Sequence, residues 1–175
     1  MTRSPVVPAA ALLLLAAACA QPAPRQAAAA PVVDTAAAKA GMAALRNRYI
    51  AGQTAGDASA VAALYTDDAA VDIYGLPRLR GRASIEAAFK EDYAARKYTM
   101  TEIMPTETSV RTGTDGSEIG TYHDMHDAKG KVDHEWGRYL VGMSRGDDGQ
   151  WRLSYLMAFP DSIKAEKGAA TPAKK

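Results

Sequence analysis

Apolar residues recur at helical spacing in three segments of the first half of the chain. Asp34 or Thr35 suits the N-cap of the first segment, and breaks at 56–57 and 75–77 separate the segments. The apolar faces consist of Met42, Leu45 and Tyr49; Val61, Leu64 and Tyr65; and Ile85, Ala88, Phe89 and Tyr93. The pattern predicts three amphipathic helices, and we expect Phe89 to be buried against a sheet.

The apolar period changes to two in the second half of the chain. Strand-like runs cover 98–112, 118–126, 132–145 and 150–160, and turn-forming sequences separate them. An earlier strand alternates Val71 and Ile73 with Asp72 and Tyr74. Strands joined by short turns pair antiparallel. The order predicts an α+β fold in which three helices pack on a long, curved, mainly antiparallel sheet and leave a cone-shaped cavity.

The N-terminus has the layout of a secretory signal. Arg3 precedes an apolar run at 6–18 that is too short to span a bilayer. The following LAAAC sequence resembles a bacterial lipobox, with Ala16 where leucine is usual and Cys19 as the residue that receives lipid. We therefore expect export to the periplasm or cell envelope as a membrane-anchored lipoprotein; the alternative is ordinary cleavage that discards the thiol.

Composition divides the rest of the chain into a folded part and two extensions. Every aromatic residue lies between Tyr49 and Phe159, so a single domain is expected at 36–161. Segments 19–35 and 162–175 are rich in Ala, Pro or Lys and predict a flexible linker and a disordered tail. A formal net charge of +1 argues against nucleic-acid binding, and one cysteine excludes an internal disulfide.

Several short motifs carry a resemblance to a known superfamily. They are 48–57 (RYIAGQTAGD), 61–71 (VAALYTDDAAV), 80–85 (RGRASI), 120–122 (GTY), 137–141 (GRYLV) and 149–153 (GQWRL). Together they resemble the nuclear transport factor 2-like superfamily, and within it the SnoaL-like and ketosteroid-isomerase-like bacterial domains. The resemblance covers nearly all of 36–161 and implies the cone-shaped fold, but it leaves the function open.

The resemblance also implies positions for acid/base chemistry. Tyr49 matches the tyrosine that polarises a substrate carbonyl in the isomerase-like members. The position of their proton-transferring carboxylate is Ile73, which cannot carry a proton. Asp72 is one residue away and therefore points to the opposite face of a strand. The missing carboxylate favours binding over catalysis, with Tyr49, Asp72 and His123 as the candidate catalytic residues.

The three histidines lie close together in the predicted hairpin around 129–130. In that hairpin His123 lies opposite Trp136 and shares a sheet face with His134. The other face carries His126 with Asp124 and other acids, which indicates a solvated charged face. No metal-binding spacing occurs, so we expect no metal site.

A ligand pocket is expected between the first helix and the last two strands. Tyr49, Trp136, Arg138 and Tyr155 should converge there, with an inward Arg138 receiving an acceptor or anionic group. Alternation also places Trp151, Tyr155 and Phe159 on one face of the final strand.

The function expected from the sequence is binding of a small, mostly apolar molecule or of a protein partner. The alternative is an acid/base enzyme of isomerase, dehydratase or cyclase type using the same pocket. No nucleotide-binding or nucleophile-elbow motif occurs, so no cofactor is expected. The resemblance adds a possible homodimer, because superfamily members commonly pair through their sheets.

Overall fold

The computed structural model describes residues 33–165 of the chain. The helices are α1 (Thr35–Ala55), α2 (Ala58–Ala62) and α3 (Arg82–Ala95). The strands are β1 (Tyr65–Ile73), β2 (Leu79–Arg80), β3 (Lys97–Thr112), β4 (Asp115–Ala128), β5 (Lys131–Arg145) and β6 (Trp151–Ala165). The predicted signal, Cys19, most of the linker and most of the tail lie outside the described residues.

Local capping chemistry explains where the helices begin. The side chain of Asp34 accepts a hydrogen bond from the backbone N–H of Ala37, and Asp57 does the same for Ala60, each at 2.9 Å. Gly56 ends α1 in the left-handed conformation, at φ 66°. No helix within residues 33–165 has the length and hydropathy needed to cross a membrane.

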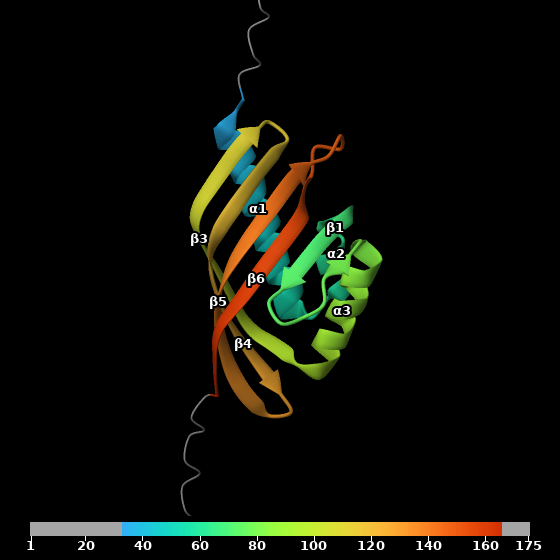
Figure 1. Cartoon of the computed structure of the whole chain (residues 1–175), viewed down its shortest axis with the longest axis vertical. Coiled ribbons are helices and arrows are strands. Elements are labelled where there is room, and N and C mark those ends of the chain that lie inside the picture. The colour runs from blue at the N-terminus through green and yellow to red at the C-terminus, as the bar shows by residue number, and fades with distance from the viewer. Residues whose placement is uncertain (1–32, 166–175) are drawn as a thin grey trace, which may run out of the picture. The chain divides into compact units, whose positions relative to one another are not determined.

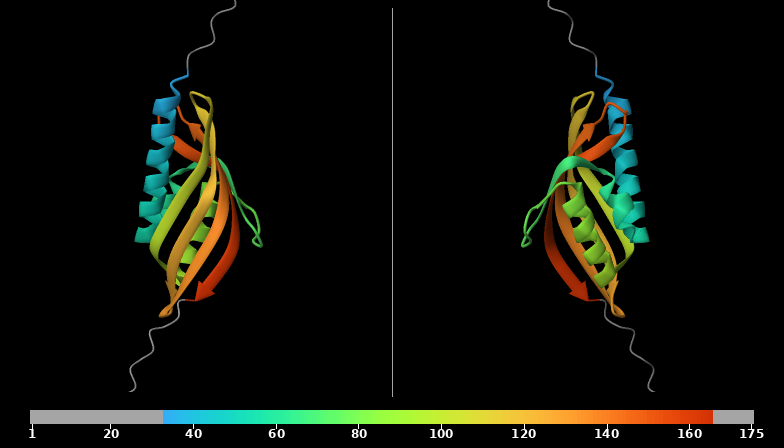
Figure 2. Two further views of the ribbon diagram at one scale, coloured as in Figure 1. Left: turned by 90° about the vertical axis from the view of Figure 1, so that its left-hand side faces the viewer. Right: turned by 90° about the vertical axis from the view of Figure 1, so that its right-hand side faces the viewer.

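The six strands form one sheet in the order β2-β1-β6-β5-β4-β3. All neighbours pair antiparallel except β1 and β6, which are parallel. Strands β3 to β6 form a long, curved meander, and α1 and α3 lie on its concave side (Figures 1 and 2). The predicted α+β fold is therefore confirmed.

One element boundary differs from the prediction. Tyr65 was expected on the apolar face of the second helix, but α2 ends at Ala62 and Tyr65 is the first residue of β1. The side chain of Tyr65 is fully buried in the core all the same. A buried position needs a largely apolar side chain in a helix and in a strand alike, so the residue type at 65 did not distinguish the two.

A bulge in β6 reverses which residues face the core. Leu153 pairs with Met143 and Tyr155 with Gly142, so Ser154 is an extra residue in the ladder. Before the bulge, Trp151 and Leu153 are buried in the core. After it, Tyr155 points to the opposite face, so the prediction of one continuous face from Trp151 to Phe159 is wrong.

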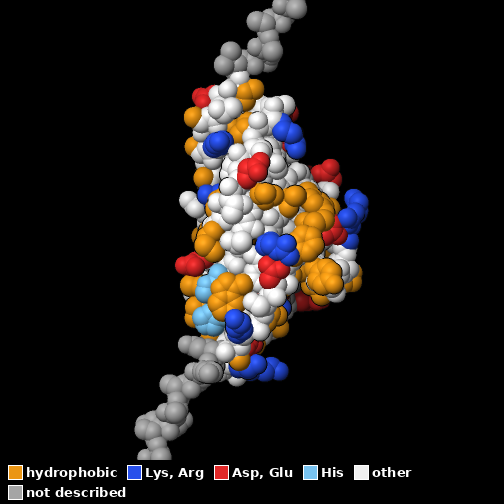
Figure 3. Space-filling view, turned by 60° about the vertical axis from the view of Figure 1, so that its left-hand side comes forward, with side chains coloured by type: hydrophobic (Ala, Val, Ile, Leu, Met, Phe, Trp, Pro, Cys, Tyr) orange, Lys and Arg blue, Asp and Glu red, His pale blue; other side chains and the backbone are white. Residues whose placement is uncertain are grey.

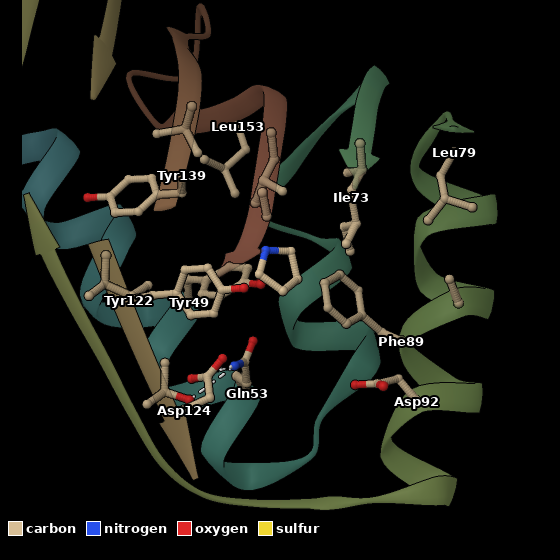
Figure 4. Close-up of a pocket in the computed structure, with 18 of the residues that line it drawn as sticks. Tyr49, Gln53, Ile73, Leu79, Phe89, Asp92, Tyr122, Asp124, Tyr139 and Leu153 are labelled. Atoms are coloured by element: carbon tan, nitrogen blue, oxygen red, sulfur yellow. Dashed lines mark hydrogen bonds between the residues drawn. The ribbon is translucent and has the colours of Figure 1, made fainter. Parts of the chain in front are cut away.

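The third helix is anchored by Ile85 rather than by Phe89. Ile85 is fully buried, whereas Phe89 is half-buried and packs at the edge of the core. We expect Ile85→Ala to lower the free energy of unfolding by about 2–5 kcal/mol. Phe89→Ala should cost less than Ile85→Ala, because the ring already borders an open space (Figure 4). Urea denaturation of both variants tests this order, and an equal or larger loss for Phe89→Ala would contradict it.

Candidate functional site

A cavity of about 750 Å³ lies between the helices and the concave side of the sheet. Most of its wall is apolar, and a few polar groups project into it from separate elements (Figure 4). The apolar part of the wall includes Leu45, Val71, Ile73, Phe89, Val141 and Leu153. Its volume suits a small organic molecule.

One polar group of the cavity is centred on Asp124, which β4 positions. Asp124 is buried, and Gln53 from α1 donates a hydrogen bond to its Oδ1 at 3.2 Å (Figure 4). The same amide nitrogen donates to Thr101 Oγ1 on β3 at 3.0 Å. Thr101 is also the register partner of Asp124 across the β3–β4 ladder. Three different elements therefore fix the orientation of this carboxyl group.

The environment of Asp124 makes it a weak acid. The pKa of Asp124 is raised from 3.8 to about 7, mainly by burial in the cavity wall and in addition by the negative charge of Glu135. Hydrogen bonds from Thr101 and Gln53 to the carboxylate act in the opposite direction but do not cancel the effect of burial. Near neutral pH both protonation states are populated, so the group can take up or release a proton.

Glu135 is a second carboxyl group in the same wall. It lies directly opposite Asp124 in the β4–β5 register and lines the cavity. The hydroxyl of Tyr122 donates a hydrogen bond to Glu135 Oε1 at 2.8 Å. The two carboxyl groups thus lie opposite each other on neighbouring strands, in different hydrogen-bonding environments.

Tyrosine hydroxyls form another polar feature of the wall. Tyr49 on α1 lines the cavity, and burial raises its pKa well above 10, so it stays a neutral hydrogen-bond donor. Tyr65 also lines the cavity, and its buried hydroxyl has no partner within residues 33–165. The ring of Phe89 packs against both, with centroid distances of 6.4 and 6.3 Å. Of the two, the hydroxyl of Tyr49 can donate to an acceptor on a ligand, whereas that of Tyr65 is buried in the wall.

A third polar group lies nearer the start of α1. Arg46 pairs with Glu118, whose side chain is 1% exposed. Glu118 also accepts hydrogen bonds from the hydroxyls of Tyr139 at 2.7 Å and Thr108 at 3.2 Å. Arg46, Glu118 and Tyr139 all line the cavity.

Of the four side chains predicted to form the pocket, only Tyr49 lines the cavity. Arg138 is 65% exposed and pairs with Asp161 on the other face of the sheet. The reason is strand parity: Tyr139 and Val141 take the inner face of β5, so Trp136 and Arg138 point outward. The predicted inward orientation of Arg138 and Trp136 is wrong.

Tyr155 and Asp72 are also on the outer side. The Tyr155 hydroxyl donates a hydrogen bond to Asp72 at 2.7 Å, and Arg78 donates two more to the same carboxylate. Arg78, followed by Tyr155, lowers the pKa of Asp72. Ile73, one residue on, lines the cavity instead. Asp72 therefore does not replace the missing carboxylate at Ile73.

The histidines follow the predicted hairpin register, in which His123 lies opposite Trp136. His123, His134 and Trp136 stack on the outer face, and His123 Nε2 and His134 Nδ1 are 3.0 Å apart. Figure 3 shows histidine side chains beside hydrophobic ones on the surface of the protein. The candidate His123 is therefore outside the cavity. No group of three metal-ligating side chains occurs within residues 33–165.

The other face of the hairpin corrects a second expectation. Asp124 and His126 are buried, whereas the sequence indicated a solvated charged face. The predicted hairpin register is therefore correct, but the side of the sheet that carries Asp124 faces inward and not toward solvent. In the structure Val141 and Met143 are buried and pair with Glu118 and Gly116, and the residues of the same strand parity, Asp124 included, face inward with them.

A curved sheet, three helices and an apolar cavity with a few polar side chains define a cone-shaped α+β fold. The sequence profile of the SnoaL-like domain matches residues 34–157. The chain therefore belongs to the SnoaL-like family, within the nuclear transport factor 2-like fold. No curated protein matches the sequence closely enough to count as a relative.

Solved structures support the same fold. A type 2 hexachlorocyclohexane dehydrochlorinase (LinA) is 18% identical, with a TM-score of 0.67 over 81% of this chain and 98% of that chain. A ketosteroid isomerase-like protein from Erwinia carotovora atroseptica is 17% identical, with a TM-score of 0.64 over 70% and 95%. A scytalone dehydratase-like protein from Novosphingobium aromaticivorans is 13% identical, with a TM-score of 0.66 over 78% and 93%. Members of this fold thus include isomerases and dehydratases.

Proposed function

We propose that the protein is an acid/base enzyme of isomerase or dehydratase type that acts on a small, mostly apolar substrate. The observation that carries the proposal is Asp124, a carboxyl group buried in the cavity wall with a pKa of about 7. A group with a pKa near the working pH is suited to general acid/base catalysis. The proposal reverses the preference for binding that the missing carboxylate at Ile73 suggested.

The residues around the cavity have complementary roles in the proposed reaction. The ionised Asp124 takes a proton from a carbon next to a carbonyl group, and the electrons of the broken C–H bond move toward the carbonyl oxygen. Tyr49 donates a hydrogen bond to that oxygen, where negative charge develops. Asp124 then returns the proton to a second carbon in an isomerisation, or to a departing β-hydroxyl group, which leaves as water, in a dehydration.

Names of similar proteins support this class of reaction. The solved structures include proteins named for ketosteroid isomerisation, scytalone dehydration and dehydrochlorination. Each of these reaction types transfers a proton from carbon, which one buried carboxyl group in an apolar cavity can perform. The substrates in those names are not carried over to this chain.

Hydrogen–deuterium exchange at carbon tests the proposal without a known substrate. The wild-type protein is incubated in D₂O with apolar ketones and β-hydroxyketones, and deuterium incorporation or loss of water is followed by NMR. We expect Asp124→Asn to lower the rate at least a hundredfold, because general acid/base catalysis contributes that much. The amide oxygen of asparagine can still accept from Gln53, so the local structure is kept.

Asp72→Asn is the matched control, since it removes a carboxyl group that does not line the cavity. Its rate should equal that of the wild type. An Asp124→Asn variant that keeps the wild-type rate would contradict the proposal. Binding of these compounds without exchange by the wild type would favour the second candidate, a carrier, which the mostly apolar wall supports.

We also propose that the protein is exported and anchored to the membrane through lipid on Cys19. The support is the sequence alone, in which Cys19 directly follows a short apolar run. Cys19→Ser should move the protein from the membrane fraction to the soluble fraction of the cell envelope, as measured by fractionation and immunoblotting. Membrane association that persists in Cys19→Ser would contradict the anchor, and a wild-type protein that starts after Cys19 would indicate ordinary cleavage.

A homodimer that pairs through the outer face of the sheet is proposed as the assembly. Ile119 and Leu140 support it, because both are large apolar residues about 40% exposed on that face. Sedimentation equilibrium of the wild type and of Leu140→Glu tests it. A monomeric wild-type protein would contradict the proposal.

A further inference from the structure

We infer that Arg46 is a recognition site for a neutral oxygen acceptor, such as a carbonyl group, at the end of the substrate remote from Asp124. The inference deepens the proposed function, on which it rests for the identity of the reacting end. It assigns the ligand class of the cavity: an elongated apolar molecule with an oxygen function at each end.

Arg46 has hydrogen-bond donors that its ion pair with Glu118 does not use. A guanidinium group presents five N–H donors. Within the described part of the chain only Nη1 has a side-chain partner, which is Glu118. The Arg46 side chain is 19% exposed and belongs to the cavity wall. The other donors are therefore available to a molecule in the cavity.

The carboxylate of Glu118 determines which ligand groups can bind to Arg46. Its oxygens already accept hydrogen bonds from Arg46, Thr108 and Tyr139, and its side chain is almost completely buried. Glu118 therefore neutralises Arg46 rather than serving as a free acceptor. An anionic ligand group would be repelled by Glu118, whereas a carbonyl oxygen needs only the N–H donors. The pair thus selects a neutral acceptor.

The distance between the two ends of the cavity determines the length of the ligand. Arg46 and Gln53, which holds Asp124, both lie on α1 and both line the cavity. They are seven residues apart, which is two helical turns on one face and a rise of about 10.5 Å. Tyr49 lies between them on the same helix. A ligand that reaches both ends therefore spans about 10 Å with its apolar body.

Competition binding with a matched pair of naphthalenes tests the inference. N-phenyl-1-naphthylamine serves as the fluorescent reporter, and 2-acetylnaphthalene and 2-isopropylnaphthalene displace it. The two competitors have the same shape, but only the first has an acceptor oxygen. The measured quantity is the ratio of their affinities, which cancels the general effect of hydrophobicity on each protein variant.

The double variant keeps the charges of the pair balanced, whereas the single variant leaves Arg46 without its carboxylate partner. Glu118→Gln retains Arg46, and the double variant Arg46→Met/Glu118→Gln removes the guanidinium without leaving a lone buried carboxylate. We expect the affinity ratio to stay within threefold of wild type in Glu118→Gln and to fall about tenfold in the double variant. The charged 2-naphthoate should compete less well than 2-acetylnaphthalene against wild type.

The outcomes separate the inference from the proposed function. An unchanged ratio in the double variant, with a fall in Tyr49→Phe or Asp124→Asn instead, would overturn the role of Arg46 and leave the proposed reaction intact. A tenfold fall in the double variant together with a normal exchange rate in Asp124→Asn would support Arg46 and reject the proposed role of Asp124. Tighter binding of 2-naphthoate than of the ketone would overturn the preference for a neutral acceptor.

Discussion

Asp124→Asn is expected to remove a contribution of about 4 kcal/mol to the pH dependence of stability. The pKa of Asp124 is about 7 in the folded protein, against an ordinary value of 3.8. A difference of about three between folded and unfolded pKa values corresponds to about 4 kcal/mol in the free energy of unfolding.

The direction follows from proton binding. Because the folded state binds the Asp124 proton more tightly than the unfolded state, its contribution is fully present below about pH 4. It is lost as the pH rises through the folded pKa of about 7. The free energy of unfolding of wild type minus that of Asp124→Asn should therefore fall between pH 4 and pH 8.

Urea denaturation at a series of pH values measures this difference, since titrations common to both proteins cancel. Asp72→Asn is a control of opposite sign, because Arg78 and Tyr155 lower the pKa of Asp72. Its contribution is present above the unfolded pKa and lost as the pH falls. A difference for Asp124→Asn that does not change between pH 4 and pH 8 would show that its pKa is not raised.

Most of the fold could be predicted from the sequence because it depends on strong local signals. The cap at Asp34, the break at 56–57 and the turn at 129–130 appear in the structure where the sequence places them. The hairpin register follows from the turn, so His123 faces Trp136 as predicted. Tyr65 is the exception, because it lies in a strand and not in the predicted helix. Its large side chain indicates a buried position but does not indicate whether that position belongs to a helix or a strand.

The site could be predicted only in part, because its residues depend on which face of the sheet is turned inward. Both faces of β4 and β5 carry mixed side chains: Leu140 is apolar and exposed, whereas Glu118 is charged and buried. Hydrophobicity alone therefore does not fix the phase, and Arg138 was placed on the wrong side. The bulge at Ser154, which turns Tyr155 outward, has no local sequence signal comparable to a turn.

The raised pKa of Asp124 could not be predicted from the sequence, for a related reason. It results from the meeting of α1, β3 and β4, which are separated along the chain by up to 71 positions between Gln53 and Asp124. A carboxyl group in register with Glu135 is equally compatible with a solvated surface. Only the closure of the helices over the concave face removes it from water and makes it a weak acid.

Glu118→Leu is expected to lower the free energy of unfolding by about 3–5 kcal/mol. The change removes a buried acceptor and leaves Arg46, Tyr139 and Thr108 without their partner. Breaking one side of a buried ion pair costs this much because the other charge stays out of water without compensation. Urea denaturation at neutral pH measures the loss.

The double variant Arg46→Met/Glu118→Leu separates the pair from simple packing. Replacing both members of a buried ion pair by apolar side chains is often neutral or stabilising, so most of the lost stability should return. Glu118→Gln, which keeps an oxygen acceptor for Tyr139 and Arg46, should cost less than Glu118→Leu. A double variant as unstable as Glu118→Leu alone would contradict this expectation. It would mean that Glu118 stabilises the fold through Tyr139 and Thr108, and that its ion pair with Arg46 contributes little.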